Sequence, residues 1–572
     1  MGHSASGKTM MQIEAAAFRT GPESPFWPSG FDAHLPFPEG NAIGNLIRSA
    51  SRHPERPSMH YYGRTFSYAE LLDSVTALAG FLQHRCGVKR GDRVLLDMQN
   101  SPQFVIAFHA ILRADAVVVP ANPMNLADEL DYLASDSGAR VAIIGDELID
   151  RFAALMPVRL DHVIVARYAD AVPEPCNDQL PEVMRRPPAE IAGKGFIDFR
   201  QALAASFEPS PTKAVSSDLA VMPYSSGTTG KPKACMHLHS AVIFTAAAQA
   251  KWYGVDETAV MTSFMPMFHV AGMQASMSAG IFAGAALVIM TRWDRDLIPA
   301  LFARHQVTWW SAAPTMIVDV LASSGFSDEI FAHLKVLTGG GASMPAAVAQ
   351  RLEERYGLRF CEGYGLTETI SATHINPVDR PKPQCLGLPI FDTASLVVDP
   401  ETLEELPVGE VGEILVAGPQ VMAGYWQRPE ATREAFVDID GKRFLRTGDL
   451  GYVDLEGYFF IVDRLKRMIS VSGFKVWPAE CEMLLYRHPA VQECCVISAP
   501  DPYRGETVKA LISLKPEFRD KVTDRDIGDF ARTVMAAYKV PRIIEFVDRL
   551  PRSGSNKIDW RKLQDAEWSK LQ

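Results

Sequence analysis

Several features that mark other classes of protein are missing from this sequence. Its eight cysteines form no CxxC pair, and Cys494 and Cys495 are adjacent, so neither a disulfide framework nor a zinc ribbon is indicated. Positive charge is not in excess, because the chain has 57 Lys and Arg residues and 68 Asp and Glu residues. The net charge of −11 argues against a nucleic-acid partner. No apolar stretch near the N-terminus resembles a secretory signal. We therefore expect a cytoplasmic protein.

A long apolar run suited to a bilayer is also missing. The nearest stretch, Val270–Met290, carries no charge, but its glycine, serine and glutamine residues make it weakly apolar for a membrane span. We interpret it as a buried helix that runs into a buried strand. No integral membrane segment is expected.

The length of 572 residues exceeds what one ordinary core supports, so two or more domains are expected. Segments with helical spacing of apolar residues alternate with short apolar strands, which is typical of α/β proteins with mostly parallel, helix-covered sheets. Helices are expected at 42–53, 68–83, 102–113 and 126–135, and strands at 93–98, 116–119 and 141–144. Several prolines between residues 171 and 195 indicate an irregular segment at the protein surface. Beyond about residue 465 the pattern changes to a smaller α+β unit.

The first residues contain a misleading pattern. Gly2–Thr9 matches GxxxxGK[ST], the phosphate-binding loop of many nucleotide-binding proteins. That motif needs a strand before it, which a chain end does not offer. We interpret the match as accidental or as part of a leader segment that is not native.

The most informative stretch is Tyr224–Lys233, with the sequence YSSGTTGKPK. Its glycines allow the backbone to approach a ligand, its N–H groups can form an anion-binding concavity, and Lys231 and Lys233 add positive charge. These are the properties of a polyphosphate cradle. The alternative is a flexible Gly/Ser/Thr loop.

A second informative block is Cys361–Thr369, with the sequence CEGYGLTET. Tyr364 offers a flat face for a nucleotide base, Thr367 a hydroxyl for phosphate, and Glu368 a hard oxygen ligand for Mg²⁺. The alternative is a polar turn between core elements.

Two further segments could border a substrate. His269 follows FMPMF, and Met273 lies four residues later, where flexible thioether side chains could line an adaptable channel or simply fill the core. Gly339, Gly340 and Gly341 follow a short strand and would allow a ligand to lie on the backbone, although an ordinary strand-to-helix turn would look the same.

Taken together and in this order, the blocks resemble the signature motifs of the adenylate-forming superfamily. That superfamily includes acyl-CoA synthetases, firefly-type luciferases and adenylation domains of peptide synthetases. Thr447-Gly448-Asp449, Asp463–Arg467, Ser472–Val476 and Leu550–Ile558 continue the resemblance, which covers all but about the first forty residues. Ser470 and Lys475 differ from luciferases and plant coumarate ligases and are closer to bacterial fatty acyl-CoA ligases.

The resemblance implies a role for each matching residue. Lys557, Glu368, Thr367 and Lys233 would be catalytic, with Glu368 holding Mg²⁺. The ATP site would comprise Ser225, Ser226, Gly227, Thr228, Thr229, Gly230, Lys231, Gly341, Glu362, Gly363, Tyr364, Asp449 and Arg464. The acid pocket would comprise His269, Met273, Gly339, Gly340 and Gly365. Lys466 would be the hinge, and Ser472, Gly473 and Phe474 would guide CoA. Two departures are Ala234 and Asn556, where the superfamily usually has glycine.

The implied organisation is a leader at 1–40, an adenylation domain at 41–464 and a mobile C-terminal domain at 465–572. The implied reaction is ATP-dependent activation of a carboxylic acid to acyl-AMP, followed by transfer to CoA. A medium- or long-chain fatty acid is favoured by the methionine-rich segment and the glycine-rich wall. Alternatives are an aryl acid, loading of a carrier protein and, in a different class, a nucleotide-binding protein without catalysis. The state of assembly is open, with a homodimer as the common default.

Overall fold

The computed structural model describes residues 26–225, 231–323, 328–340, 344–471, 474–501, 505–552 and 558–571. The GxxxxGK[ST] pattern at Gly2–Thr9 lies outside these residues. The chain divides into two compact units. The larger unit comprises Met1–Ser395, Val416–Leu445 and Glu456–Phe459, and the smaller unit comprises Leu396–Leu415, Arg446–Leu455 and Phe460–Gln572. The domain boundary expected at residue 464 stays a prediction.

One sheet of the larger unit is parallel at its centre and antiparallel at one end. β3 pairs in parallel with β4 and β5, and the parallel pairing continues through β6 and β7. β10 is antiparallel to β8, β9 and β20. The strands, in sheet order, are β20 (Gly424–Tyr425), β10 (Lys233–Leu238), β8 (Leu219–Val221), β4 (Val117–Pro120), β3 (Arg93–Asp97), β5 (Val141–Gly145), β6 (His162–Ala166) and β7 (Phe196–Asp198), with β9 (Tyr224–Ser225) on β10.

The other sheet of the larger unit is also mostly parallel. Its parallel run extends from β1 through β12, β11, β13 and β14 to β15, and antiparallel strands flank it at both ends. The strands, in sheet order, are β17 (Leu388–Pro389), β16 (Ala372–Ile375), β15 (Phe360–Gly365), β14 (Val336–Gly340), β13 (Trp309–Ser311), β11 (Val260–Ser263), β12 (Ala286–Ile289), β1 (Pro57–Tyr61) and β2 (Arg64–Ser67). The predicted fold class, α/β with mostly parallel sheets, is confirmed.

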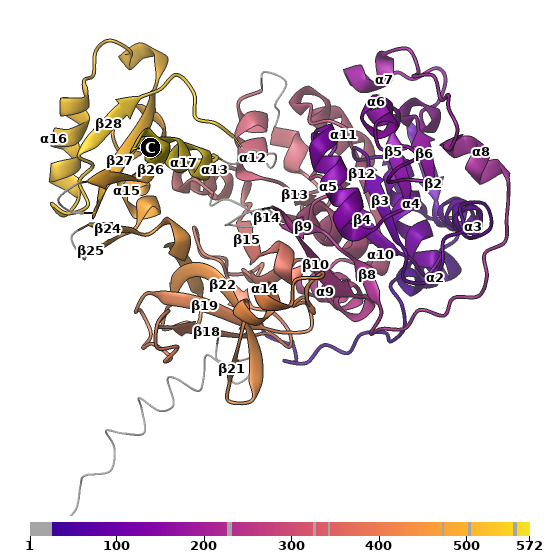
Figure 1. The fold of residues 1–572 in the computed structure, drawn as a ribbon, viewed down its shortest axis with the longest axis horizontal. Coiled ribbons are helices and arrows are strands. Elements are labelled where there is room, and N and C mark those ends of the chain that lie inside the picture. Colours follow the sequence, from indigo (N-terminus) through magenta and orange to yellow (C-terminus); the bar gives the residue numbers. More distant parts are fainter. Residues whose placement is uncertain are drawn as a thin grey trace, which may run out of the picture. The chain divides into compact units, whose positions relative to one another are not determined.

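Helices enclose these strands (Figure 1). They bury apolar side chains against both sheets, as where Leu130 and Leu133 of α5 pack with Leu95 and Val119. The helices of this unit are α2 (Ile43–Arg52), α3 (Tyr68–His84), α4 (Pro102–Arg113), α5 (Ala127–Ser137), α6 (Ile149–Ala153), α7 (Glu182–Arg185), α8 (Phe199–Ala204), α9 (His239–Trp252), α10 (Ala279–Ala283), α11 (Ile298–His305), α12 (Pro314–Leu321), α13 (Ala346–Tyr356) and α14 (Pro429–Glu434).

The expected helices and strands of the first 150 residues are present within one or two residues of their expected bounds. Local sequence explains where they begin and end. Ser101 Oγ accepts a hydrogen bond from Phe104 N, which confirms it as the N-cap of α4. α5 ends at Gly138, whose φ of +69° suits glycine.

The segment Val270–Met290 forms a helix followed by a strand, as expected. Its first part, η4 (Ala271–Ser278), is a π-helix that continues into α10 and then into β12. π-Helical turns are rare and occur frequently at functional sites. In the described part of the chain, no helix is long and apolar enough to cross a membrane.

The smaller unit has its own sheet and core. β26 (Val491–Asp501) and β27 (Gly505–Leu514) form a long antiparallel pair, accompanied by β24 (Ile469–Val471), β25 (Phe474–Val476) and β28 (Ile543–Phe546). α15 (Pro478–Leu485) and α16 (Asp524–Val534) cover one face, and α17 (Trp560–Trp568) covers the other. Since side chains alternate along a strand, Cys494 points into the first core and Cys495 into the second.

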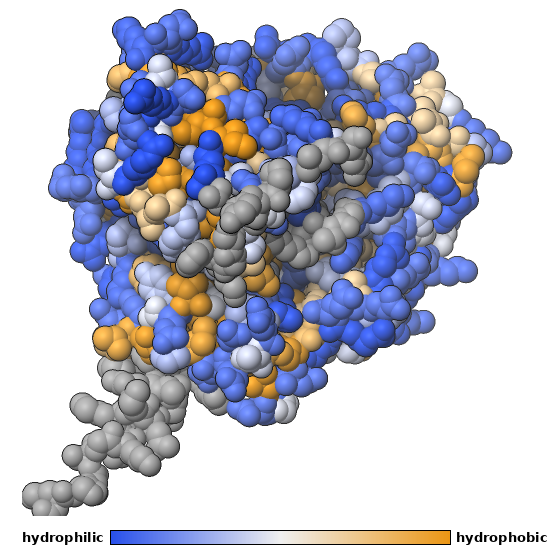
Figure 2. Space-filling model, turned by 60° about the vertical axis from the view of Figure 1, so that its left-hand side comes forward, coloured by the Kyte–Doolittle hydropathy of each residue, from blue (hydrophilic) through white to orange (hydrophobic). Residues whose placement is uncertain are grey.

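The remaining strands are β18 (Ala394–Val398), β19 (Gly412–Ala417), β21 (Phe436–Ile439), β22 (Lys442–Val453) and β23 (Phe459–Arg464). β21 and β22 are antiparallel, with Phe436 opposite Leu445. Figure 2 shows a face on which hydrophilic side chains predominate and apolar side chains form several separate groups.

Candidate active site

The predicted phosphate loop is the connection of an antiparallel ribbon. β9 pairs with β10 so that Ser225 lies opposite Lys233 and Tyr224 lies opposite Ala234. This register places one predicted hydroxyl beside one predicted lysine. Ala234, which replaces the usual glycine, is buried, and its methyl group belongs to the apolar core that also contains Leu130 and Met222.

Helix α5 holds both ends of this loop. Tyr132 Oη donates to the carbonyl oxygen of Pro232 (2.7 Å), and Lys231 Nζ lies 5.0 Å from the centre of the Tyr132 ring. One turn along α5, Asp136 accepts a hydrogen bond from Tyr224 Oη (2.9 Å). The side chain of Arg428 pairs with the same carboxylate (2.6 Å).

The second predicted block leads directly to the first. β15 ends at Gly365, and the turn η7 (Thr367–Thr369) follows. His237 Nε2 on β10 donates to the carbonyl oxygen of Thr367 (2.7 Å), and Tyr425 Oη on β20 donates to Glu368 Oε1 (2.9 Å). Burial lowers the pKa of His237 to about 4, so the imidazole is neutral and donates from one nitrogen only.

These contacts bring together Ser225, Lys233, Thr367 and Glu368, which are up to 143 residues apart in the chain. The turn is tightened by Ile370, whose φ of +50° is uncommon for a β-branched residue. Such strain persists only where neighbouring contacts hold it, as they do here through Thr369 Oγ1, which donates to the carbonyl oxygen of Ser371 (2.7 Å).

The chemistry around Glu368 fits a magnesium ion. Its carboxylate is partly exposed, and the described residues offer it no Lys or Arg ion pair. One carboxylate with a neighbouring hydroxyl is a sparse donor set, and Mg²⁺ is usually held this way, with phosphate oxygens and water completing the shell. Accordingly, no group of three or more His, Cys, Asp or Glu side chains suited to a metal occurs in the described part of the chain.

The glycine-rich ends of β14 and β15 lie side by side. Gly339 pairs with Glu362, and Gly340 pairs with Gly363. A β-carbon at Gly339 would collide with the Ala312 carbonyl oxygen, and one at Gly340 would collide with the Gly363 carbonyl oxygen. The neighbouring backbone therefore explains why glycine is needed at these two positions.

Glu362 is buried beneath this edge. Its Oε1 accepts hydrogen bonds from the backbone N–H groups of Met344 (3.3 Å) and Gln384 (3.0 Å). Burial raises the pKa of Glu362 to about 7. Tyr364 is buried too, and its ring lies 5.7 Å from that of His374.

A cavity of about 440 Å³ opens at the other ends of these strands, beside Lys335 and Arg359. Arg359 is already paired with Glu353 (2.9 Å). Ligands of parallel sheets bind at the carboxyl ends of the strands, so this cavity is not part of the candidate site.

The predicted acid-pocket residues border the π-helix and α9. His269 is exposed just before η4, whereas Met273 is fully buried. Within η4, Ala271 and Ala275 are the partly exposed positions. Sequence reasoning missed these two alanines, because small apolar side chains give no chemical signal.

Helix α9 connects the separate parts of this region. Thr245 Oγ1 donates to Gln274 Oε1 in η4 (3.3 Å), and Gln249 Nε2 donates to Ser371 Oγ (2.7 Å), next to Gly365. At its end, Tyr253 Oη lies 2.7 Å from Thr338 Oγ1 on β14. The predicted acid-pocket segments therefore share one helical support.

The smaller unit brings its two predicted ribose contacts together. Arg464 Nε lies 2.7 Å from Asp449 Oδ1, and Asp449 is fully buried. Gly448, with φ of +68°, turns the strand there, and Gly448 N donates to Glu413 Oε1 (3.1 Å). Glu413, which no sequence motif indicated, also pairs with Arg446 (2.6 Å).

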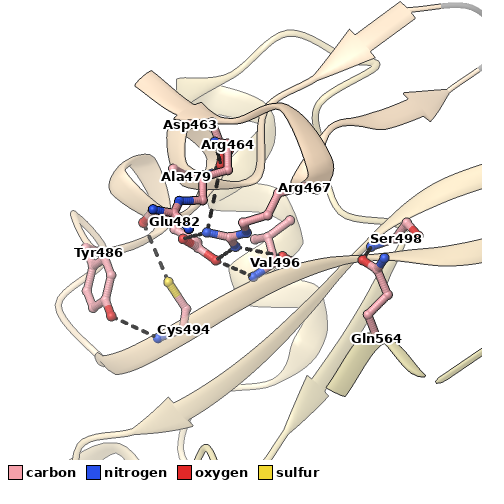
Figure 3. Close-up of polar contacts among 10 residues, drawn as sticks. All are labelled: Asp463, Arg464, Arg467, Ala479, Glu482, Tyr486, Cys494, Val496, Ser498 and Gln564. Carbon is pink, nitrogen blue, oxygen red and sulfur yellow. Dashed lines mark hydrogen bonds and ion pairs between the residues drawn. The ribbon is translucent and has the colours of Figure 1, made fainter. Parts of the chain in front are cut away.

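The predicted hinge lies in η8 (Leu465–Arg467), and its flanks are bound to α15 and β26 (Figure 3). Asp463 Oδ2 accepts a hydrogen bond from Ala479 N (2.6 Å). Arg467 pairs with Glu482 (2.5 Å) and donates to the carbonyl oxygen of Val496 (3.1 Å). For Lys466, only the backbone position is described.

Several predicted residues lie outside the described part of the chain. They are Ser226, Gly227, Thr228, Thr229, Gly230, Gly341, Ser472, Gly473 and Lys557. Elements that flank them are described: β24 and β25 pair with Val471 opposite Phe474, and Arg552 pairs with Ile558. The roles of these residues stay predictions.

The sequence matches two family models, "AMP-binding enzyme" over residues 46–426 and "AMP-binding enzyme C-terminal domain" over residues 480–557. The first match alone covers more than half of the chain. The chain belongs to the AMP-binding enzymes. This confirms the predicted membership of the adenylate-forming superfamily.

Individual AMP-binding enzymes match over nearly the whole chain. A long-chain-fatty-acid–CoA ligase of Bacillus subtilis is 34% identical over 95% of this chain and 97% of its own length. A feruloyl-CoA synthase of Amycolatopsis is 34% identical over 90% of this chain and 96% of its own. Among solved structures, ATP-bound MatB from Rhodopseudomonas palustris is 27% identical with a TM-score of 0.82, covering 93% of this chain and 99% of its own.

Proposed function

We propose that this AMP-binding enzyme activates a carboxylic acid with ATP and transfers the acyl group to CoA, releasing AMP and pyrophosphate. The observation that carries the proposal is the contact between two separate motifs. His237 and Tyr425 link the strand of the phosphate loop to the turn that holds Thr367 and Glu368. A chance pair of motifs would not meet in this way.

The mechanism follows from charge. The acid's carboxylate must attack the α-phosphorus of ATP, and both reactants are anions, so positioning and neutralisation supply most of the catalysis. Lys231 and Lys233 would neutralise the departing pyrophosphate, and Thr367 would donate to the α-phosphate. Lys557 would add a positive charge as the bond to pyrophosphate breaks and acyl-AMP forms.

Glu368 would hold Mg²⁺, which when bound supplies positive charge to the phosphate oxygens. Asp449 and Arg464 would bind the ribose, and Tyr364 would pack against the adenine. In the second step the smaller unit would turn about Lys466. Ser472, Gly473 and Phe474 would then guide the CoA sulfur to the acyl carbonyl carbon, and AMP would leave.

We favour a medium- or long-chain fatty acid as the substrate. The relative from Bacillus subtilis carries that name, and the partly exposed face of η4 presents only alanine side chains. An aryl acid is the second candidate, because the relative from Amycolatopsis is a feruloyl-CoA synthase of equal identity. We further propose a cytoplasmic location and, as the default assembly, a homodimer.

Lys557→Ala tests the assignment. The variant should lose ATP–pyrophosphate exchange by at least about a thousandfold, because one charge at a transferring phosphoryl group is worth that much. It should still convert supplied acyl-AMP and CoA to acyl-CoA. If exchange survives in the variant, Lys557 does not act in adenylation.

A panel of saturated and aryl acids in an assay for AMP release would rank the substrates. Release that requires free CoA separates a CoA ligase from an enzyme that loads a carrier protein. A protein that binds ATP but releases no AMP with any acid would be a nucleotide-binding protein without catalysis.

A further inference from the structure

Tyr425 is not among the residues to which the sequence analysis assigns a role, yet it contacts the predicted metal ligand directly. It lies on β20, whose pairing with β10 sets it opposite Cys235. Its own backbone is held as well, since Tyr425 N donates to Thr432 Oγ1 (2.9 Å). Rigid strand pairing therefore fixes where the phenol points.

The phenol engages only one side of the carboxylate. Tyr425 Oη lies 2.9 Å from Glu368 Oε1, which leaves Oε2 for another partner. The backbone of Glu368 is held as well, because Met422 N donates to the Glu368 carbonyl oxygen (2.8 Å). Both the carboxylate and its backbone are thus oriented by the segment 422–425.

The same ring also faces a predicted phosphate ligand. Lys233 Nζ lies 5.0 Å from the centre of the Tyr425 ring, within the range of a cation–π contact. One aromatic side chain therefore contacts both the lysine of the phosphate ribbon and the carboxylate of η7.

The phenol is the donor in its contact with Glu368, because an ionised carboxylate oxygen can only accept a hydrogen bond. Its chemistry suits orientation of a neighbouring ligand.

We propose that Tyr425 is a positioning residue of the metal–nucleotide site, which orients the Glu368 carboxylate for Mg²⁺ and couples it to Lys233. The inference rests on the proposed function. Outer partners of metal-binding carboxylates typically contribute 10–100-fold to metal affinity when they are removed. Tyr425 has the position, the donor and the rigidity that such a partner needs.

Tyr425→Phe removes only the phenolic oxygen and tests the inference. The probe is Mn²⁺, whose binding in the presence of a non-hydrolysable ATP analogue can be followed by electron paramagnetic resonance. We expect the variant to bind Mn²⁺ about tenfold more weakly. Its affinity for AMP without metal should stay within about twofold of the parent protein, which shows that the site is folded.

Tyr458→Phe is a matched control. Tyr458 Oη also donates one hydrogen bond, to the carbonyl oxygen of Arg380 (2.9 Å), and Lys382 Nζ lies 4.4 Å from the centre of its ring. The difference is the acceptor, which is a backbone carbonyl instead of Glu368. Mn²⁺ affinity in this variant should match that of the parent protein.

A double-mutant cycle with Glu368→Gln shows whether Tyr425 acts through Glu368. If it does, adding Tyr425→Phe to Glu368→Gln changes Mn²⁺ affinity by less than about twofold. Additive losses, or unchanged Mn²⁺ affinity in Tyr425→Phe alone, would overturn the role of Tyr425 and leave the proposed function intact. Failure of the parent protein to bind Mn²⁺ with the nucleotide analogue would count against the proposed function itself.

Discussion

At the scale of single residues, Asp97 is a buried acid that the proposed reaction does not use. It ends β3 and is fully buried, and neither carboxyl oxygen has a hydrogen-bond partner among the described residues. Burial, followed by the nearby charge of Glu147, raises the pKa of Asp97 to about 8. The folded protein therefore holds a proton there at neutral pH.

This proton makes stability depend on pH. An unfolded Asp has a pKa of about 3.9, so between about pH 4 and 8 the folded state binds a proton that the unfolded state lacks. The stabilisation that depends on this proton is fully present below about pH 4. As the pH rises toward 8, the free energy of unfolding falls by at most about 1.4 kcal/mol per pH unit. Asp97→Asn should remove this slope.

Thermal unfolding of the parent protein and Asp97→Asn at pH 5, 6, 7 and 8 measures the effect. The variant should gain in melting temperature relative to the parent as the pH increases, because the amide has no proton to lose. If the difference in melting temperature between the variant and the parent protein is the same at every pH, Asp97 is ionised in the folded protein.

At the scale of elements, the π-helix η4 determines which side chains border the predicted acid pocket. Met273, Gln274 and Met277 are fully buried, whereas Ala271 and Ala275 keep partial exposure four residues apart. The wide π-helical turn places these two alanines in adjacent turns. Their small side chains leave room that a larger residue would fill.

Ala275→Phe should therefore shift the preference toward shorter acids. We expect kcat/KM for a long-chain acid to fall by about tenfold or more and that for a short-chain acid to change little. Met277→Leu, a volume-conserving change of a buried neighbour, should leave the ratio unchanged. An equal loss for all acids in Ala275→Phe would place the acyl chain elsewhere.

At the scale of the whole molecule, each unit has a core of its own. In the smaller unit the core includes Ile469, Val496, Ile512 and Ile527. The buried pair of Arg467 and Glu482 ties η8 to α15 in the same unit, with side chains only 14% and 17% exposed. Removing one partner of a buried pair leaves an uncompensated charge, which costs about 3–5 kcal/mol.

Calorimetry should show more than one unfolding transition, because separate cores need not unfold together. Arg467→Met should lower one transition by roughly 10 °C and leave the others in place. The double change Arg467→Met with Glu482→Met should recover part of the loss. Arg532→Met, at an exposed pair with Asp529, should cost less than about 1 kcal/mol. One two-state transition for the whole chain would contradict independent cores.

Much of the fold could be predicted from the sequence because its signals are local. Apolar spacing predicted α3, α4 and β3, and Ser101 marked a helix start through its own hydroxyl. The π-helical geometry of η4 could not be predicted, because apolar residues at helical spacing do not distinguish it from an α-helix. Gly339 and Gly340 were predicted to let a ligand lie on the backbone. Their steric need for glycine could not be predicted, because the carbonyl oxygens of Ala312 and Gly363 that cause it come from segments distant in the sequence.

By itself, the sequence determined the class of fold and the residues able to do the chemistry, since hydroxyls, lysines and carboxylates at short spacings reflect local backbone needs. Only the tertiary structure decided which of them meet. Tyr425 reaches Glu368 across 57 residues because β20 pairs with β10, and strand pairing between distant segments depends on the whole sheet. Burial likewise arises only on folding, and it alone turned Asp97 from an ordinary acid into one that keeps its proton.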